Sequence, residues 1–106
     1  MSTKTQITQA VFRVIDAMEA PYRGQIVRLR LAQGETPTIK ELKGARLVAR
    51  SPEGAKVTLR VLGFPFFGGR PSDGRLKRTG RVDLVVESER EGDPPVARRW
   101  EVLANP

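Results

Sequence analysis

Short runs of alternating apolar and polar residues constrain this chain more than any other feature of its sequence. Val27 and Leu29 fall on one face of such a run, with Arg28 between them on the other. Strict alternation with a period of two indicates β-strands that have one buried and one solvated face, as in antiparallel sheets. The runs with a strand-like pattern are Ala10–Ala17, Gly24–Leu31, Ala45–Arg50, Ala55–Phe64, Gly80–Glu87 and Val96–Leu103.

Six short strands within 106 residues predict an all-β fold, a small six-stranded antiparallel barrel. Closure of the sheet would leave no strand edge exposed. The length fits one domain, with a core at about residues 9–104 and a flexible tail at residues 1–8. We expect one helical turn at Ile39–Leu42, whereas the segment Gly63–Gly80 reads as a long irregular loop.

A tight turn at residues 51–54 fixes the register of one predicted hairpin. Pro52 suits the first position of a type I turn, and Gly54 suits a residue in the left-handed conformation. A three-residue loop places Ala49 opposite Val57, both facing the core. A loop longer by one residue would turn a lysine inward, which the burial pattern forbids.

The predicted hairpin also brings like charges together on its outer face. Arg50 falls opposite Lys56, and further along the same face Arg46 falls opposite Arg60. Such pairs are unfavourable by roughly a few tenths of a kcal/mol. Either this face is kept basic to meet phosphates, or acidic residues of a neighbouring strand neutralise it. The acids in question are Asp83 and Glu87.

The segment 63–80 combines aromatic and basic residues. Half of the six aromatic residues lie here, namely Phe64, Phe66 and Phe67. Phenylalanines beside glycines and arginines can stack on an unpaired base and clamp it. Alternatively, Phe64 closes the barrel mouth and leaves a solvated basic loop. Trp100 is either a binding platform or a residue packed against the barrel. The polyanion-binding candidates are Arg28, Arg30, Arg46, Arg50, Lys56, Arg60, Arg70, Arg75, Lys77 and Arg78, and the stacking or interaction candidates are Phe66, Phe67 and Trp100.

Composition argues against catalysis. The chain contains no cysteine and no histidine, which excludes thiol nucleophiles, disulfides, Cys/His metal sites and histidine-based catalysis. The acidic run 83–93 lacks the ligand spacing of a calcium-binding EF-hand loop, so we expect neither a metal nor a cofactor. No run of 18 apolar residues could span a membrane. Without a signal sequence, a cytoplasmic location is expected.

The order of strands and glycines resembles the second domain of translational GTPases of the elongation factor Tu type, a six-stranded barrel. The segments that carry the resemblance are 12–16, 23–34, 42–48, 79–84 and 98–104. Gly24, Gly34 and Gly44 occupy the family's glycine positions at the start and end of the second strand and at the start of the third. Leu29 stands where a further glycine is usual, and Ala45 replaces an acidic residue. In that family the domain does no chemistry and contacts transfer RNA or the ribosome.

A net charge of +7 and a pI near 10.8 favour a negatively charged partner. We therefore expect a non-catalytic binding module that contacts RNA or another polyanion. The alternative is a protein-interaction or accessory module, in one version a homo-oligomer, with exposed aromatic residues as anchors.

Overall fold

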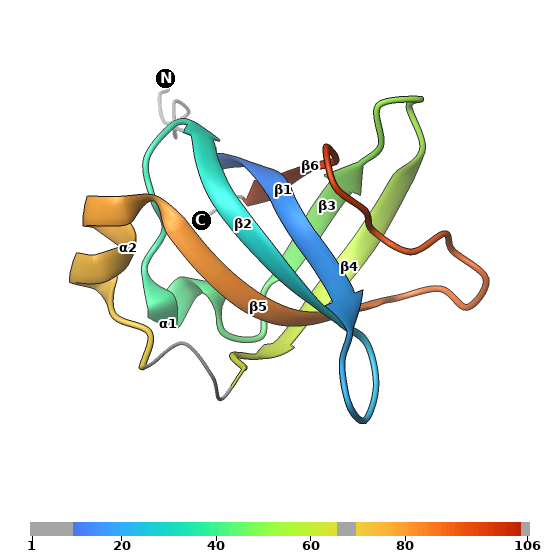
Figure 1. Ribbon diagram of the computed structural model, residues 1–106, viewed down its shortest axis with the longest axis horizontal. Helices are drawn as coiled ribbons and strands as arrows, with labels where there is room; N and C mark the ends of the chain where they lie inside the picture. Colours follow the sequence, from blue (N-terminus) through green and yellow to red (C-terminus); the bar gives the residue numbers. More distant parts are fainter. Residues whose placement is uncertain (1–9, 66–69, 105–106) are drawn as a thin grey trace, which may run out of the picture.

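The computed structural model describes residues 10–65 and 70–104 of the chain, and it confirms the closed six-stranded antiparallel barrel. The predicted tail at residues 1–8 and the candidates Phe66 and Phe67 lie outside the described residues. The strands are β1 (Ala10–Glu19), β2 (Gln25–Gln33), β3 (Arg46–Arg50), β4 (Lys56–Gly63), β5 (Arg81–Ser88) and β6 (Glu101–Ala104). Around the barrel they follow the order β1-β2-β5-β4-β3-β6, and β6 pairs back with β1 (Figure 1).

The inward faces of the strands form one apolar core. Val27, Leu47, Leu59 and Val82 come from four different strands and belong to a single cluster, each at most 8% exposed. Among the described residues, no polar or charged residue is buried in that core. The alternation seen in the sequence therefore places the charged side chains on the outside of the barrel.

The β3–β4 hairpin has the predicted register. Ala49 lies opposite Val57, and the Ser51 N–H donates to the Ala55 carbonyl at 2.9 Å, which closes a three-residue loop. Gly54 has a φ of 100°, in the left-handed region that favours glycine. Turn chemistry and burial pattern together were enough to fix this pairing.

The sequence had suggested that the segment 63–80 is a long irregular loop, and this prediction was wrong in part. It contains the helix α2 (Asp73–Thr79), which begins after Ser72 and ends at Gly80. The Ser72 side chain accepts from the Arg75 N–H, and Gly80 has a φ of 70°. The helix buries only Leu76, so no apolar repeat of 3.6 residues marks it in the sequence.

The helix α1 (Ile39–Leu42) confirms the expected helical turn, and it is bonded to α2. Thr38 and Glu41 cap it reciprocally. The Asp73 carboxylate of α2 accepts the Ile39 N–H at 2.6 Å. Both helices lie at one end of the barrel (Figure 1), where Leu42 and Leu76 join the core.

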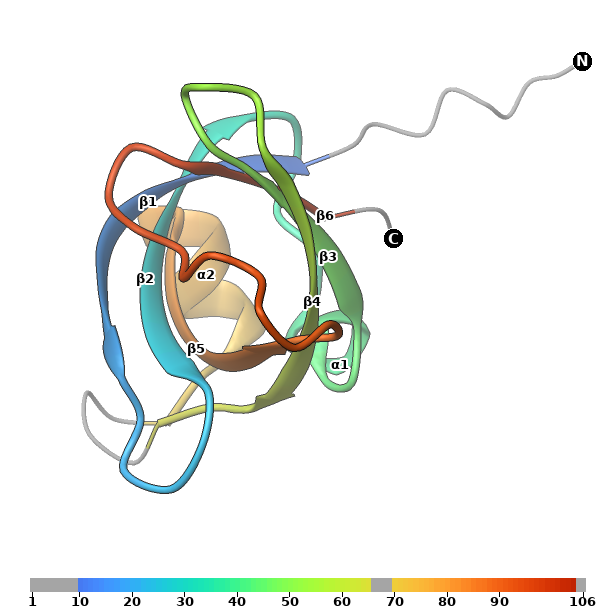
Figure 2. The same cartoon turned by 90° about the vertical axis from the view of Figure 1, so that its right-hand side faces the viewer.

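The loop between β5 and β6 crosses the other end of the barrel (Figure 2). The run Val96–Leu103 was predicted to be a strand, but β6 covers only Glu101–Ala104. The residues before β6 form a cap instead, with Val96 and Trp100 buried in the core. The Gln25 side chain holds this cap, because it donates to the Val96 carbonyl at 2.9 Å and accepts the Val96 N–H at 3.0 Å.

Two glycines with nearly equal backbone geometry provide a test of the β2–β5 contact. Gly24 and Gly44 have φ values of 79° and 74°, but only at Gly24 would a Cβ collide with a neighbour, the Val86 carbonyl oxygen. We expect Gly44→Ala to cost about 1 kcal/mol, for the left-handed backbone alone. Gly24→Ala should cost about 3 kcal/mol or more. Urea denaturation measures both, and equal losses would contradict the close approach of these strands.

Candidate functional site

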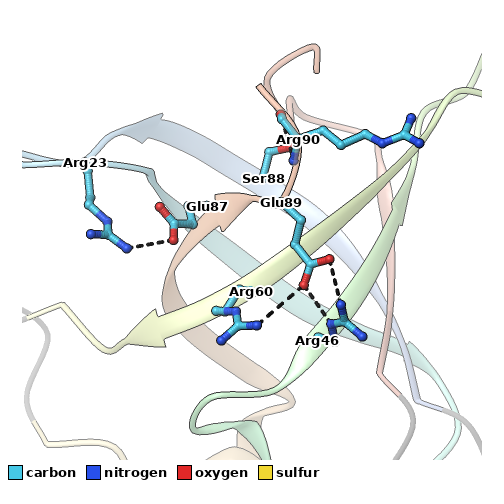
Figure 3. A network of polar contacts seen from close by, with 7 residues as sticks. All are labelled: Arg23, Arg46, Arg60, Glu87, Ser88, Glu89 and Arg90. Carbon is cyan, nitrogen blue, oxygen red and sulfur yellow. Dashed lines mark hydrogen bonds and ion pairs between the residues drawn. The ribbon is translucent and has the colours of Figure 1, made fainter. Parts of the chain in front are cut away.

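Two arginines on the outer face of the β3–β4 hairpin share one carboxylate from beyond β5. Glu89 accepts from the Arg46 guanidinium at 2.7 and 3.0 Å, and an Arg60 nitrogen lies 3.9 Å away (Figure 3). The Glu89 N–H donates to the Thr58 carbonyl, which aims the side chain over β4 toward β3. The hydrogen bond from Arg46 is the main cause that lowers the pKa of Glu89; desolvation opposes it, and the positive charges of Arg46 and Arg60 lower the pKa by smaller amounts. The same bond raises the pKa of Arg46.

Two further candidates are paired with acids on neighbouring strands. Arg28 donates to Asp83 at 3.1 Å, and this bond raises the pKa of Arg28. Asp83 was expected to neutralise the hairpin face, but it pairs with Arg28 of β2 instead. Arg50 donates to Glu101 at 3.2 Å. Glu87 accepts from Arg23 at 2.7 Å, although it lies opposite Arg60 in the sheet (Figure 3). Within the described residues, Lys56 alone of the hairpin cations has no ion pair.

A different arrangement occurs on β1, β2 and β5. Arg30 lies directly opposite Arg13 of β1 on one side and directly opposite Arg81 of β5 on the other. All three residues are exposed, and cross-strand partners have Cβ atoms about 5 Å apart. No ion pair links any of the three to an acid within residues 10–65 and 70–104. We call these three residues the arginine row.

The neighbouring row on the same strands shows what the arginine row lacks. There Arg28 lies opposite Asp16 on one side and Asp83 on the other, so that charges alternate. Two residues further along β2, Arg30 meets only other arginines. On its other side, Arg13 lies opposite Glu101 of β6, which is bonded to Arg50. The barrel therefore carries a row of three adjacent arginines beside a row in which charges alternate.

A hollow of about 320 Å³ adjoins the arginine row at Arg81. It lies between α2, the residues that follow β4 and the start of β5. Among the described residues, its lining includes four arginines and one carboxylate. The charged residues that line it are Arg28, Arg70, Arg75, Arg81 and Asp83, and the apolar ones are Ile39, Phe64, Pro65, Pro71, Leu76 and Val82.

The structure therefore separates the sequence candidates. Arg30, Arg70 and Arg75 lie on the arginine row or around the hollow. Lys77 and Arg78 are exposed on α2 and do not line the hollow. Trp100 is 7% exposed and packs in the core, so it offers no stacking platform, and the alternative of packing against the barrel is the correct one.

Sequence reasoning missed Arg13 and Arg81 as site residues. Each was visible as an outward position in an alternating run, but only the pairing of β1 and β5 with β2 brings them beside Arg30. The role of Glu89 was also missed, because this residue follows the end of β5 and reaches across two strands.

Comparison with protein-family models, curated proteins and solved structures finds no match to this chain. The resemblance to the elongation factor Tu barrel thus stays a prediction. Neither helix in the described part of the chain is long enough to cross a membrane. Within the same residues, no group of three potential metal ligands converges.

The pairing of Glu89 predicts a pH effect with a definite sign. Its pKa is lowered in the folded state, so the pairing stabilises the fold above about pH 4.3, the ordinary glutamate value, and this contribution is lost as the pH falls through the lowered pKa. We expect Arg46→Gln to raise the Glu89 pKa toward its ordinary value, as measured by NMR titration of the carboxyl carbon. Lys56→Gln is the control and should leave the titration unchanged. A Glu89 pKa that does not respond to Arg46→Gln would contradict the pairing.

The arginine row predicts that one cation destabilises the fold. Arg30→Gln removes two like-charge contacts and should raise the free energy of unfolding by about 0.2–1 kcal/mol. Arg28→Gln, two residues away on the same face, removes the bond to Asp83 and should leave stability unchanged or lower it by up to about 1 kcal/mol. Urea denaturation at low ionic strength compares the two variants. A loss of stability in Arg30→Gln would show that a compensating partner exists.

Proposed function

We propose that this chain is a non-catalytic binding module whose barrel contacts RNA or another polyanion. The arginine row carries the proposal, because three exposed arginines lie in direct register on adjacent strands. Among the described residues none of the three forms an ion pair, and the one acid opposite the row, Glu101, is bonded to Arg50. A polyanion would relieve the repulsion among these groups. Guanidinium groups also match phosphate oxygens by forming paired hydrogen bonds.

The distribution of acids supports the same proposal. Elsewhere on the barrel, arginines on neighbouring strands are bonded to Asp83, Glu89 or Glu101. An external anion would have to displace these carboxylates before it could bind there. The arginine row requires no such displacement, so it is the better electrostatic site.

The sequence supports a binding role rather than a catalytic one. Histidine and cysteine are absent from all 106 residues, which removes the commonest general bases and nucleophiles. The polar groups of the hollow are mainly arginines, which stay protonated and serve to bind and orient anions.

Neutralising the arginine row tests the proposal. The variant Arg13→Gln, Arg30→Gln, Arg81→Gln should bind heparin and single-stranded RNA at least tenfold more weakly than the wild type at low salt. Because a variant with fewer phosphate contacts releases fewer counterions on binding, the slope of log K against log salt for RNA should become shallower by about 2. Fluorescence anisotropy across a salt series measures both quantities.

A control with the same loss of charge comes from the opposite side of the barrel. Arg46→Gln, Lys56→Gln, Arg60→Gln also removes three cations, all from the hairpin face. This variant should keep most of the affinity. Equal losses in the two variants would mean that net charge alone attracts the polyanion, and wild-type binding insensitive to salt would reject the proposal altogether.

A further inference from the structure

The hollow beside the arginine row combines two kinds of surface. The apolar part is formed by residues anchored in the barrel and its helices, among them Val82 and Leu76, which are 8% and 2% exposed. Phe64 also belongs to this part, and it packs against the core while remaining only partly buried. Its ring is therefore held in place by the barrel and still borders the hollow.

The cationic part of the hollow is formed by arginines from three segments. Arg81 starts β5, Arg75 lies on α2, and Arg70 precedes that helix. Arg28 also borders the hollow, but the bond to Asp83 occupies its guanidinium. The lining thus keeps an excess of positive charge after its one acid is paired.

The positions of α2 and its flanking residues are fixed by bonds to the rest of the fold. The Asp73 carboxylate accepts the Ile39 N–H of α1, and Leu76 is buried in the core. At the end of α2, the Leu31 N–H of β2 donates to the Gly80 carbonyl at 2.7 Å. These contacts hold the α2 wall of the hollow against the barrel, so that side of the hollow is preformed.

We propose that this hollow binds a nucleoside phosphate, with the base against Phe64 and the phosphate on Arg70 and Arg81. Aromatic side chains beside cationic groups are the combination by which proteins hold unpaired nucleotides. A volume of about 320 Å³ is at the lower end for a small-molecule site. A bare phosphate would leave the apolar part unused, and an uncharged aromatic ligand would make no use of the positive charge of Arg70 and Arg81.

This inference deepens the function proposed above and rests on it, since Arg81 belongs both to the arginine row and to the hollow. The same chemistry has two sources, a free mononucleotide or one unit of a single-stranded nucleic acid. The two proposals remain separable. Heparin has charge but no bases, so it reports on the cationic surface and not on base recognition by Phe64.

The test compares four ligands on the full chain by calorimetry: AMP, UMP, a single-stranded oligouridylate and heparin. Phe64→Leu should weaken nucleotide binding about tenfold, which is typical of the loss of one aromatic stacking partner. Phe64→Tyr keeps the ring and should bind as the wild type does. Neither change should alter heparin binding. Thermal melting shows whether each variant is folded.

A second pair of variants leaves the core untouched. Arg70→Gln removes an exposed cation of the hollow and should weaken nucleotide binding at least threefold, whereas Lys77→Gln removes an exposed cation outside it and should not. Binding of AMP or UMP with these responses would identify a free nucleotide as the ligand. The same responses with the oligouridylate alone would identify a strand unit.

Nucleotide binding that ignores both Phe64→Leu and Arg70→Gln would overturn the inference, as would failure of AMP, UMP and oligouridylate to bind at all. If heparin still binds in either case and depends on the arginine row, the polyanion-binding proposal stands without it. If heparin also fails to bind, both proposals are rejected.

Discussion

The cross-strand register of a sheet closed on itself fixes where every side chain of this barrel lies. Inward positions on all six strands are apolar, so a slip by one residue in any strand would turn its core side chains into water. Because inward and outward residues alternate on each strand, the same penalty also fixes which residues face outward and which residues they lie beside. Arg30 therefore lies between Arg13 and Arg81 because the core on the other side of the same strands permits no other pairing.

The outer surface that results has two regions of opposite electrostatic character. On the hairpin side, Glu89 bridges Arg46 and Arg60, and Glu101 pairs with Arg50. Across β1, β2 and β5, the arginine row has no such bridge among the described residues, although one acid at its centre would remove the repulsion. Repulsion between adjacent arginines lowers the stability of the fold. Its presence beside an arginine-lined hollow is what the proposed binding role leads us to expect.

The sequence was informative where structure depends on a tight turn and on strand alternation. The turn at residues 52–54 and the alternation around it were enough to predict the β3–β4 register. The arginine row was out of reach, because Arg13 and Arg81 meet Arg30 only through the order of strands around the barrel. The helix α2 was missed for a different reason, since a helix of seven residues with one buried leucine leaves almost no periodic signal.

Mapping of the bound surface by NMR is the most direct test of the central claim that the uncompensated arginines form the binding surface. On titration with a single-stranded oligonucleotide, the backbone amides of Arg13, Arg30 and Arg81 should shift together and more than any on the hairpin face. Shifts centred on Arg46 and Arg60, or no localised shifts at saturation, would contradict the claim.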